Sequence, residues 1–209
     1  MSHEVGPDEE HAKSMMMWPE AFRGSGATSI WGNSLFIKDA PNKFHEASDA
    51  MNAENYWPWG PSIGDLNADG FDDAFIAAGM GYPFRYSVNS VKLNDRGKRF
   101  ADAEFVLGVE PRKDGVTEPS FELDASGKDR DHKDAAGASG RLSIWGSKST
   151  RSAAIFDIDG DGDLDIVTNE FNNVPMVLES DLSSRKAIHY VNLKLVGTTS
   201  NRDGLGAIV

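Results

Sequence analysis

Two nine-residue segments of this chain concentrate oxygen ligands at matching positions. Residues 65–73 read DLNADGFDD and residues 157–165 read DIDGDGDLD, so both follow the pattern D-x-[DN]-x-D-G-x-x-D. Carboxylates packed this closely repel one another unless a cation neutralises them, and oxygen-only ligands on a flexible loop suit a hard ion such as Ca²⁺. The pattern therefore predicts two Ca²⁺ sites.

The loop spacing also predicts which atoms contact each ion. By analogy with other calcium loops, the side chains at positions 1, 3, 5 and 9 and the carbonyl at position 7 are the ligands. The expected ligands are Asp65, Asn67, Asp69, the Phe71 carbonyl and Asp73 in the first loop, and Asp157, Asp159, Asp161, the Asp163 carbonyl and Asp165 in the second. The second loop, which has four carboxylate side chains, is expected to bind more tightly. The glycine at position 6 of each loop is expected to turn the chain with a positive φ.

Two alternatives to such a site are an EF-hand, in which helices flank the calcium loop, and a solvated turn without metal. An EF-hand needs a bidentate Glu at position 12 of the loop, where this chain has Ile76 and Thr168. Short apolar runs at 74–78 and 166–168 follow the loops and predict buried strands, so each loop is expected to join strands. Asp, Asn and Gly also gather in metal-free turns. Two copies with matched spacing and matched flanks favour the metal site over that reading.

The flanks of the two loops point to an internal repeat. Phe44 precedes the first loop by 21 residues and Phe100 precedes the second by 57, so the second copy carries about 36 extra residues. Without them the period is near 56 residues, which is typical of a propeller or another stacked β array. The charged residues between about 110 and 141 are expected to hold the extra material as a long surface loop. Brief helical turns are expected near residues 46–53 and 102–107.

These segments resemble the FG-GAP or VCBS repeats, the calcium-loop blades also found in the propellers of integrin α subunits. Residues 189–207, HYVNLKLVGTTSNRDGLGA, resemble the opening of the ASPIC/UnbV domain, which follows such repeats in the cartilage acidic protein family. The resemblance implies an all-β fold, a partial β-propeller of FG-GAP/VCBS-type blades followed by a truncated β module. It divides the chain into an N-terminal segment (1–28), a first blade (29–90), a second blade (91–182) with an insertion at about 110–141, and a truncated ASPIC/UnbV-like segment (187–209) that begins with a strand over 189–195.

The net charge, the length of the apolar runs and the cysteine content limit which partners and environments we expect for this protein. The net charge of −12 opposes binding to nucleic acid or an anionic membrane, because both are polyanions. No apolar run reaches the roughly 18 residues of a membrane span, so membrane insertion is not expected. The chain has no cysteine, so bound calcium is the stabilising device we expect in place of disulfides. The resemblance implies an extracellular or periplasmic protein whose signal peptide lies upstream of this sequence.

The function expected from these observations is a calcium-binding propeller segment of an extracellular binding or adhesion-type protein, with a protein or carbohydrate ligand. The alternative is a non-catalytic part of a larger propeller-containing enzyme, since fold alone does not fix function. No catalytic residues are expected, because the five histidines are scattered and form no metal or triad signature. Self-association through exposed blade faces is a further expectation. Trp57 and Trp59 are interpreted either as packing residues, which is favoured, or as a surface for stacking on a ligand.

Overall fold

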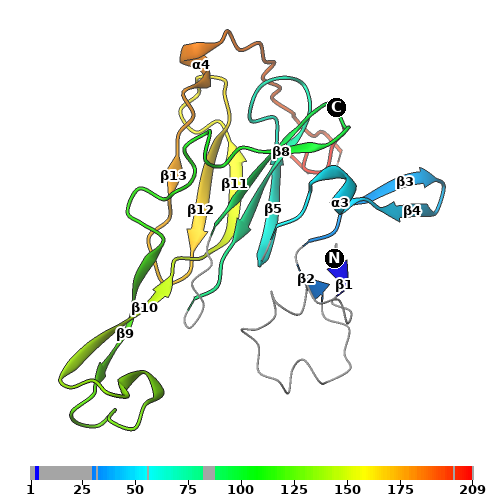
Figure 1. Ribbon diagram of the computed structural model, residues 1–209. Helices are drawn as coiled ribbons and strands as arrows, with labels where there is room; N and C mark the ends of the chain where they lie inside the picture. The colour runs from blue at the N-terminus through cyan, green and yellow to red at the C-terminus, as the bar shows by residue number, and fades with distance from the viewer. Residues whose placement is uncertain are drawn as a thin grey trace.

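Two antiparallel sheets form the body of the molecule (Figure 1). The computed structural model describes residues 3–4, 30–31, 33–55, 57–81, 88–199 and 201–208. The first sheet has the order β5-β6-β7-β8, with β5 at Pro58–Gly64, β6 at Asp73–Ala78, β7 at Ser90–Asn94 and β8 at Phe100–Asp102. The second has the order β11-β12-β13, with β11 at Thr150–Phe156, β12 at Asp165–Glu170 and β13 at Val177–Leu178.

Smaller elements surround these sheets. Two-stranded sheets pair β1 (His3–Glu4) with β2 (Ile30–Trp31), β3 (Phe36–Ala40) with β4 (Lys43–Glu46), and β9 (Thr117–Asp124) with β10 (Arg141–Ser147). The described helices are short: α3 at Ser48–Met51, α4 at Leu182–Arg185 and a 3₁₀ turn at Lys133–Ala135. None of these helices is long and apolar enough to cross a bilayer. The prediction of a mostly β protein is confirmed, and the described strands form several small sheets with no closed barrel. Apart from residues 3–4, the segment 1–28 lies outside the described residues.

The main core lies where the two sheets meet. Phe75 of β6 and Val91 of β7 are fully buried and cluster with Leu66 and Ile166. Strand β11 packs against β5 and β6. The approach is close, because a Cβ on Gly64 at the end of β5 would lie 2.9 Å from Ile155 Cγ2. Strand β5 runs directly into the first acidic loop, and β11 runs directly into the second. Because β5 and β11 pack together, the two loops lie at the same end of the molecule (Figure 1).

The internal repeat is visible in the hydrogen bonds that close equivalent turns. Ala47 N donates to Leu35 O at 2.8 Å, and 56 residues later Ala103 N donates to Val91 O at 2.9 Å. The following turn closes the same way, as α3 in the first copy and as a single turn, Leu107 N to Ala103 O, in the second. Helical turns were expected at both places. The sheets do not follow the repeat boundary at 90/91, which falls inside β7, because β6 of one copy pairs with β7 of the next.

The segment expected as a long surface loop at 110–141 is a loop only in part, because residues 117–124 form β9, which pairs with β10, while 125–140 is the connection between these two strands. Strands β9 and β10 pair over Thr117–Ser147 with one irregularity in register. Leu123, Ala125 and Ala135 are buried in a separate small core, against which Phe121 and Leu142 pack. Phe121 and Leu123 alternate with polar residues, and such a pattern buries one face of a strand. Charged residues at the tip of the hairpin obscured this alternation.

The strand expected over residues 189–195 is absent, because residues 189–199 and 201–208 carry no strand. A strand needs a neighbour to accept its backbone hydrogen bonds, and within the described residues none pairs with this segment. Its apolar side chains therefore stay in solvent, with Val191 81% exposed and Val196 69% exposed. Its sequence has strand character, but the local sequence cannot supply the missing partner.

Candidate metal centre

The two acidic loops fold alike because equivalent carboxylates accept equivalent backbone N–H groups. Asp65 Oδ2 accepts from Gly70 N at 2.8 Å, and Asp157 Oδ2 accepts from Gly162 N at 3.1 Å. The position 6 glycines have φ of +91° and +95°, as the sequence predicted. In this left-handed region a side chain is strained. The carboxylate at position 1 therefore organises the turn of each loop.

The carboxylates at position 9 anchor each loop to its sheet. Asp73 Oδ2 accepts from Leu66 N at 2.9 Å and its Oδ1 accepts from Asn94 N at 2.7 Å. Asp165 makes the equivalent pair with Ile158 N and Ser180 N, both at 2.8 Å. Both aspartates are buried at the start of the strand that follows the loop. They link the start of each loop to a later segment, which is the end of β7 at Asn94 in the first sheet and Ser180 just after β13 in the second.

The second loop gathers three of its predicted side-chain ligands. Asp157, Asp159 and Asp165 each offer a carboxylate oxygen within 4.8 Å of the others. Asp161 lies outside this group, since it accepts from Asp163 N at 3.1 Å and from the hydroxyl of Ser183. Asp163 was expected to contribute its backbone carbonyl. Its side chain is buried, and its Oδ2 accepts from Ser183 N at 2.6 Å. Three oxygen donors at this spacing fit a hard cation.

The first loop is arranged less compactly. No second group of three acidic side chains as close as that in the second loop occurs among the described residues. Asp69 Oδ1 accepts from Phe71 N at 2.9 Å, and Asp69 Oδ2 accepts from the Asn67 amide at 3.1 Å. The side-chain oxygen of Asn67 is buried without a hydrogen-bond partner. A buried polar atom left unsatisfied is costly, and an ion ligated by this oxygen would remove that cost.

Burial and the crowding of negative charge shift the pKa values of several aspartates in the acidic loops. The bond from Asp161 N lowers the pKa of Asp159, but burial and repulsion by Asp161, Asp165 and Asp157 outweigh it and leave that pKa raised. Burial raises the pKa of Asp73 against the bonds from Asn94 N and Leu66 N. The hydroxyl of Ser183 is the main reason that the pKa of Asp161 is lowered. A cation at either loop would relieve the repulsion.

A buried ion network lies at the other end of the two sheets and was missed by the sequence analysis. Arg112 Nη1 donates to Glu170 Oε2 at 3.0 Å, its Nη2 to Thr150 Oγ1 at 2.9 Å, and its Nε to Glu110 Oε1 at 3.4 Å. The three charged side chains are at most 2% exposed. Burial raises the pKa of Glu110, although Asn89 N and Arg112 oppose the shift. No spacing rule connects residues 58 positions apart, so no sequence signal pointed to the pair of Arg112 and Glu170.

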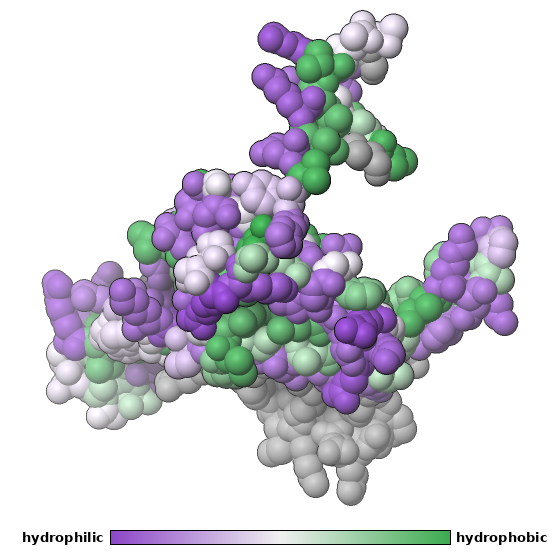
Figure 2. All heavy atoms as spheres, turned by 90° about the horizontal axis from the view of Figure 1, so that it is seen from above, coloured by the Kyte–Doolittle hydropathy of each residue, from purple (hydrophilic) through white to green (hydrophobic). Residues whose placement is uncertain are grey.

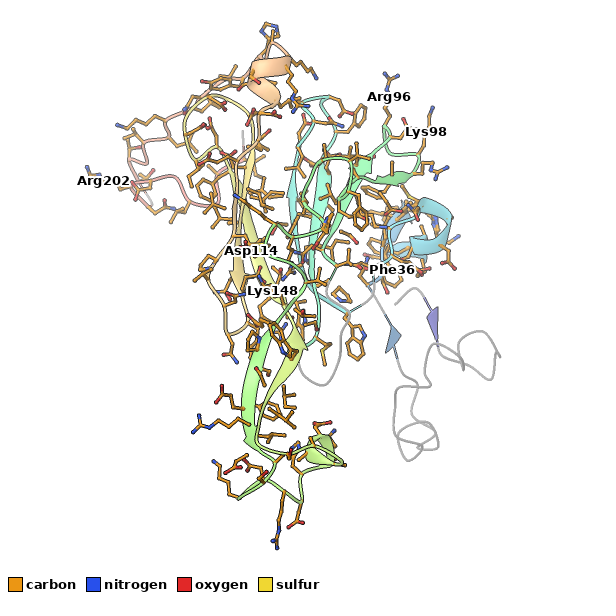
Figure 3. All side chains as sticks on the ribbon, turned by 60° about the vertical axis from the view of Figure 1, so that its left-hand side comes forward. Phe36, Arg96, Lys98, Asp114, Lys148 and Arg202 are labelled. Atoms are coloured by element: carbon orange, nitrogen blue, oxygen red, sulfur yellow. The ribbon has the colours of Figure 1, made fainter. Side chains whose placement is uncertain are left out.

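The network borders a cavity of about 390 Å³. Arg112 and Glu170 lie in its wall with Lys148 and apolar residues of the 173–178 segment. Figure 3 shows Lys148 beside Asp114 at this end of the molecule, and Lys148 Nζ lies 3.5 Å from Asp114 O. Glu110, the member of the network with the raised pKa, does not line the cavity. Glu110 accepts from Asn89 N, just before β7, so the network links the first sheet to Thr150 of β11 and Glu170 of β12.

Trp59 belongs to a packing cluster. The guanidinium of Arg151 lies 4.1 Å from the centre of the Trp59 ring and 4.7 Å from that of Phe171. Trp59 Nε1 donates to Gly79 O at 2.5 Å. These contacts link β5 to β11 and to Phe171 just after β12, and they favour the packing interpretation for one side of Trp59, whose side chain is otherwise 49% exposed.

No protein-family model, curated protein or solved structure matches this chain.

Proposed function

We propose that this chain is a calcium-binding β-repeat segment in which the ion rigidifies the loops that connect strands. The observation that carries the proposal is the group formed by Asp157, Asp159 and Asp165. An all-oxygen donor set on a loop selects a hard cation, and Ca²⁺ tolerates the irregular geometry of such a loop better than Mg²⁺. In the first loop, Asp65, Asn67, Asp69, Asp73 and the Phe71 carbonyl would hold a second ion.

The ion's contribution is electrostatic. It would neutralise carboxylates that repel one another in its absence, and so fix the ends of β5, β6, β11 and β12. Seen from above, the surface at this end is rich in hydrophilic residues (Figure 2). Two bound Ca²⁺ would change the net charge from −12 to −12 + 4 = −8. A rigid acidic surface of this kind suits recognition of a protein or carbohydrate.

The propeller assignment belongs to this proposal. The four-stranded sheet β5-β6-β7-β8 and the sheet β11-β12-β13 are similar units packed side by side, which is the arrangement of neighbouring blades. The resemblance to FG-GAP or VCBS repeats, and of residues 187–209 to an ASPIC/UnbV domain, leads us to propose an extracellular or periplasmic binding or adhesion role. Exposed apolar residues, among them Phe36 and Phe44 of the β3-β4 hairpin, are the surfaces we propose for contact with a partner or a second copy.

The rival proposal is a non-catalytic part of a larger enzyme, for which the cavity beside Arg112 and Glu170 is the relevant observation. Arg112 donates to Glu170 and to Thr150, so both charged side chains already have hydrogen-bond partners within the protein. Side chains whose hydrogen bonds are made to the protein itself suit a structural role. We therefore place binding ahead of catalysis for this chain.

Calorimetric titration with Ca²⁺ tests the proposal. We expect the folded wild-type protein to take up two ions with Kd between about 10⁻⁵ and 10⁻³ M, the weaker classes of calcium site, which include those of extracellular modules. Asp159→Asn should weaken the second site about tenfold or more, because a charged ligand is lost. In chelator the same variant should melt no lower than wild type, because Asp159 is repelled by its neighbours.

Asp131→Asn is the matched control, since it removes one carboxylate from the hairpin tip, where Asp131 is 92% exposed and far from the loops in sequence. It should change neither calcium uptake nor the melting temperature. A folded wild-type sample that takes up no Ca²⁺ at millimolar concentration would refute the proposal.

A further inference from the structure

A single segment contacts both acidic loops. We call residues 180–190 the strap; it contains α4 and lies at the loop end of the sheets (Figure 1). Ser180 N donates to Asp165, and Ser183 donates to Asp163 through its backbone and to Asp161 through its hydroxyl. The second loop is therefore held by the strap through three of its carboxylates.

The strap reaches the first loop through Lys186. Its ammonium donates to Ala68 O at 2.6 Å and to Asn67 O at 3.1 Å, across 118 and 119 residues of sequence. Lys186 forms no ion pair with a carboxylate within the part of the chain that the structure describes. A positive charge therefore already rests on the backbone of the loop that is proposed to take a cation.

Both ends of the strap oppose ion binding. A Ca²⁺ held by the first loop and the ammonium on that loop's carbonyls are like charges within one short segment, and they repel. In the second loop, Asp161 occupies the position of an expected ligand, but its oxygens accept from Ser183 and Asp163 N. To join the group formed by Asp157, Asp159 and Asp165, the Asp161 side chain has to move, and that movement disturbs its bond from the hydroxyl of Ser183.

We propose that the strap couples the two loops, so that an ion in one loop raises the affinity of the other. This inference rests on the proposed calcium function. An ion in either loop breaks contacts of the strap at one end, and that binding step includes the free energy of releasing the strap. The second ion then binds to a protein in which the strap is already released. Sites that share one conformational cost bind cooperatively, and the coupling is reciprocal. Lys186 is the positioning residue that carries the coupling to the first loop.

Removing the ammonium should have two effects. Lys186→Met should tighten the first site by about three- to tenfold, the range expected for removing a like charge a few ångströms away in water with some salt screening. It should also make the two sites independent. Relative to wild type, Asp159→Asn should weaken the first site about fivefold or more over the Ca²⁺ concentrations at which the weakened second site stays empty, at the lower end of usual coupling strengths.

The test is calorimetric titration of four proteins: wild type, Asp159→Asn, Lys186→Met and the double variant, with the backbone amide signal of Asp69 followed by NMR. In wild type we expect Asp159→Asn to weaken the first site, whereas in the Lys186→Met background the same change should leave the first site unaffected. Lys194→Met is the matched control, because it removes an exposed lysine from the same C-terminal region, and within the described residues no hydrogen bond or ion pair joins Lys194 to either loop. It should behave as wild type does.

The outcomes separate the two proposals. If wild type takes up no Ca²⁺, both the calcium function and the coupling are refuted. If both loops bind Ca²⁺ but the first site has the same affinity in all four proteins, the calcium function stands and the coupling is refuted. Because Lys186 is exposed, its substitution should leave the fold intact.

Discussion

Arg112→Met should be among the most destabilising single changes in this protein. The substitution preserves much of the side-chain volume but removes the cation that bonds to Glu110 and Glu170, both of whose side chains are at most 2% exposed. Breaking a buried ion pair by removing one partner typically costs about 3–5 kcal/mol, because the remaining charge is left uncompensated. Folded proteins are typically stable by about 5–15 kcal/mol, so this is a large fraction of the total.

The cost should be visible in both chemical and thermal unfolding. For a chain of this length about 1 kcal/mol shifts Tm by about 2–4 °C, so the expected loss is about 6–20 °C. Urea unfolding at pH 7 in the presence of chelator, followed by tryptophan fluorescence, measures the free energy directly. The deficit should shrink as pH falls towards the raised pKa of Glu110, since protonation removes the uncompensated charge.

Two further variants test this explanation. Arg112→Met combined with Glu170→Gln should lose less than the sum of the single changes, because the residues share one network. Arg130→Met removes an arginine that is 74% exposed and should change stability by less than about 0.5 kcal/mol. A loss below about 1 kcal/mol for Arg112→Met at pH 7 would show that the network does not stabilise the contact between the sheets.

Three other predictions concern single positions. Gly70→Ala should destabilise the folded state by about 1 kcal/mol or more in urea unfolding, because φ is +91° there while an added Cβ would meet nothing within 4 Å. Burial raises the pKa of Asp102, but the bond from the Lys92 ammonium and that from an asparagine amide outweigh it, so the folded pKa is lowered. The stability that Asp102 contributes is therefore present above its unfolded pKa and lost as pH falls through its folded pKa, so Asp102→Asn should be less stable than wild type at pH 7 and nearly equal to it near pH 2. Trp59→Ala should lower Tm, because the ring packs under the Arg151 guanidinium.

Each of these predictions has its own contrary result. Gly60→Ala is the control for the glycine, because a Cβ there meets nothing within 4 Å; equal effects at both positions would remove the argument from φ. A stability difference between Asp102→Asn and wild type that does not change with pH would exclude the ion pair as its cause. Loss of ligand binding at unchanged Tm in Trp59→Ala would support the stacking interpretation instead of packing.

The local sequence was sufficient for the loops and for the strands beside them. Nine residues with Asp at positions 1 and 9 and Gly at position 6 specify a turn, because the carboxylate at position 1 and one oxygen of the carboxylate at position 9 accept from backbone N–H groups of the same loop. The apolar runs that follow each loop predicted β6 and β12. The 56-residue period was likewise readable, since equivalent bonds recur at that spacing.

Other features depended on partners far away in the chain. A strand at 189–195 was expected with the ASPIC/UnbV-like segment, but no described strand pairs with it. The hairpin β9-β10 was missed because its core is completed by Ala125 and Ala135, which lie within the charged tip. The buried Arg112 network joins residues from four separate segments, and such a combination has no local pattern.

The sequence by itself determined which short segments turn, which extend and where carboxylates concentrate, because these depend on neighbours within about ten residues. Only the tertiary structure decided that β5 and β11 pack together, that their two acidic loops lie at one end, and that Lys186 of the strap reaches the first loop. Packing and charge–charge interactions act through space and fall off with distance between atoms, whatever their separation along the chain. For that reason the ligand types could be predicted from the sequence, whereas the contacts that would link one loop to the other could not.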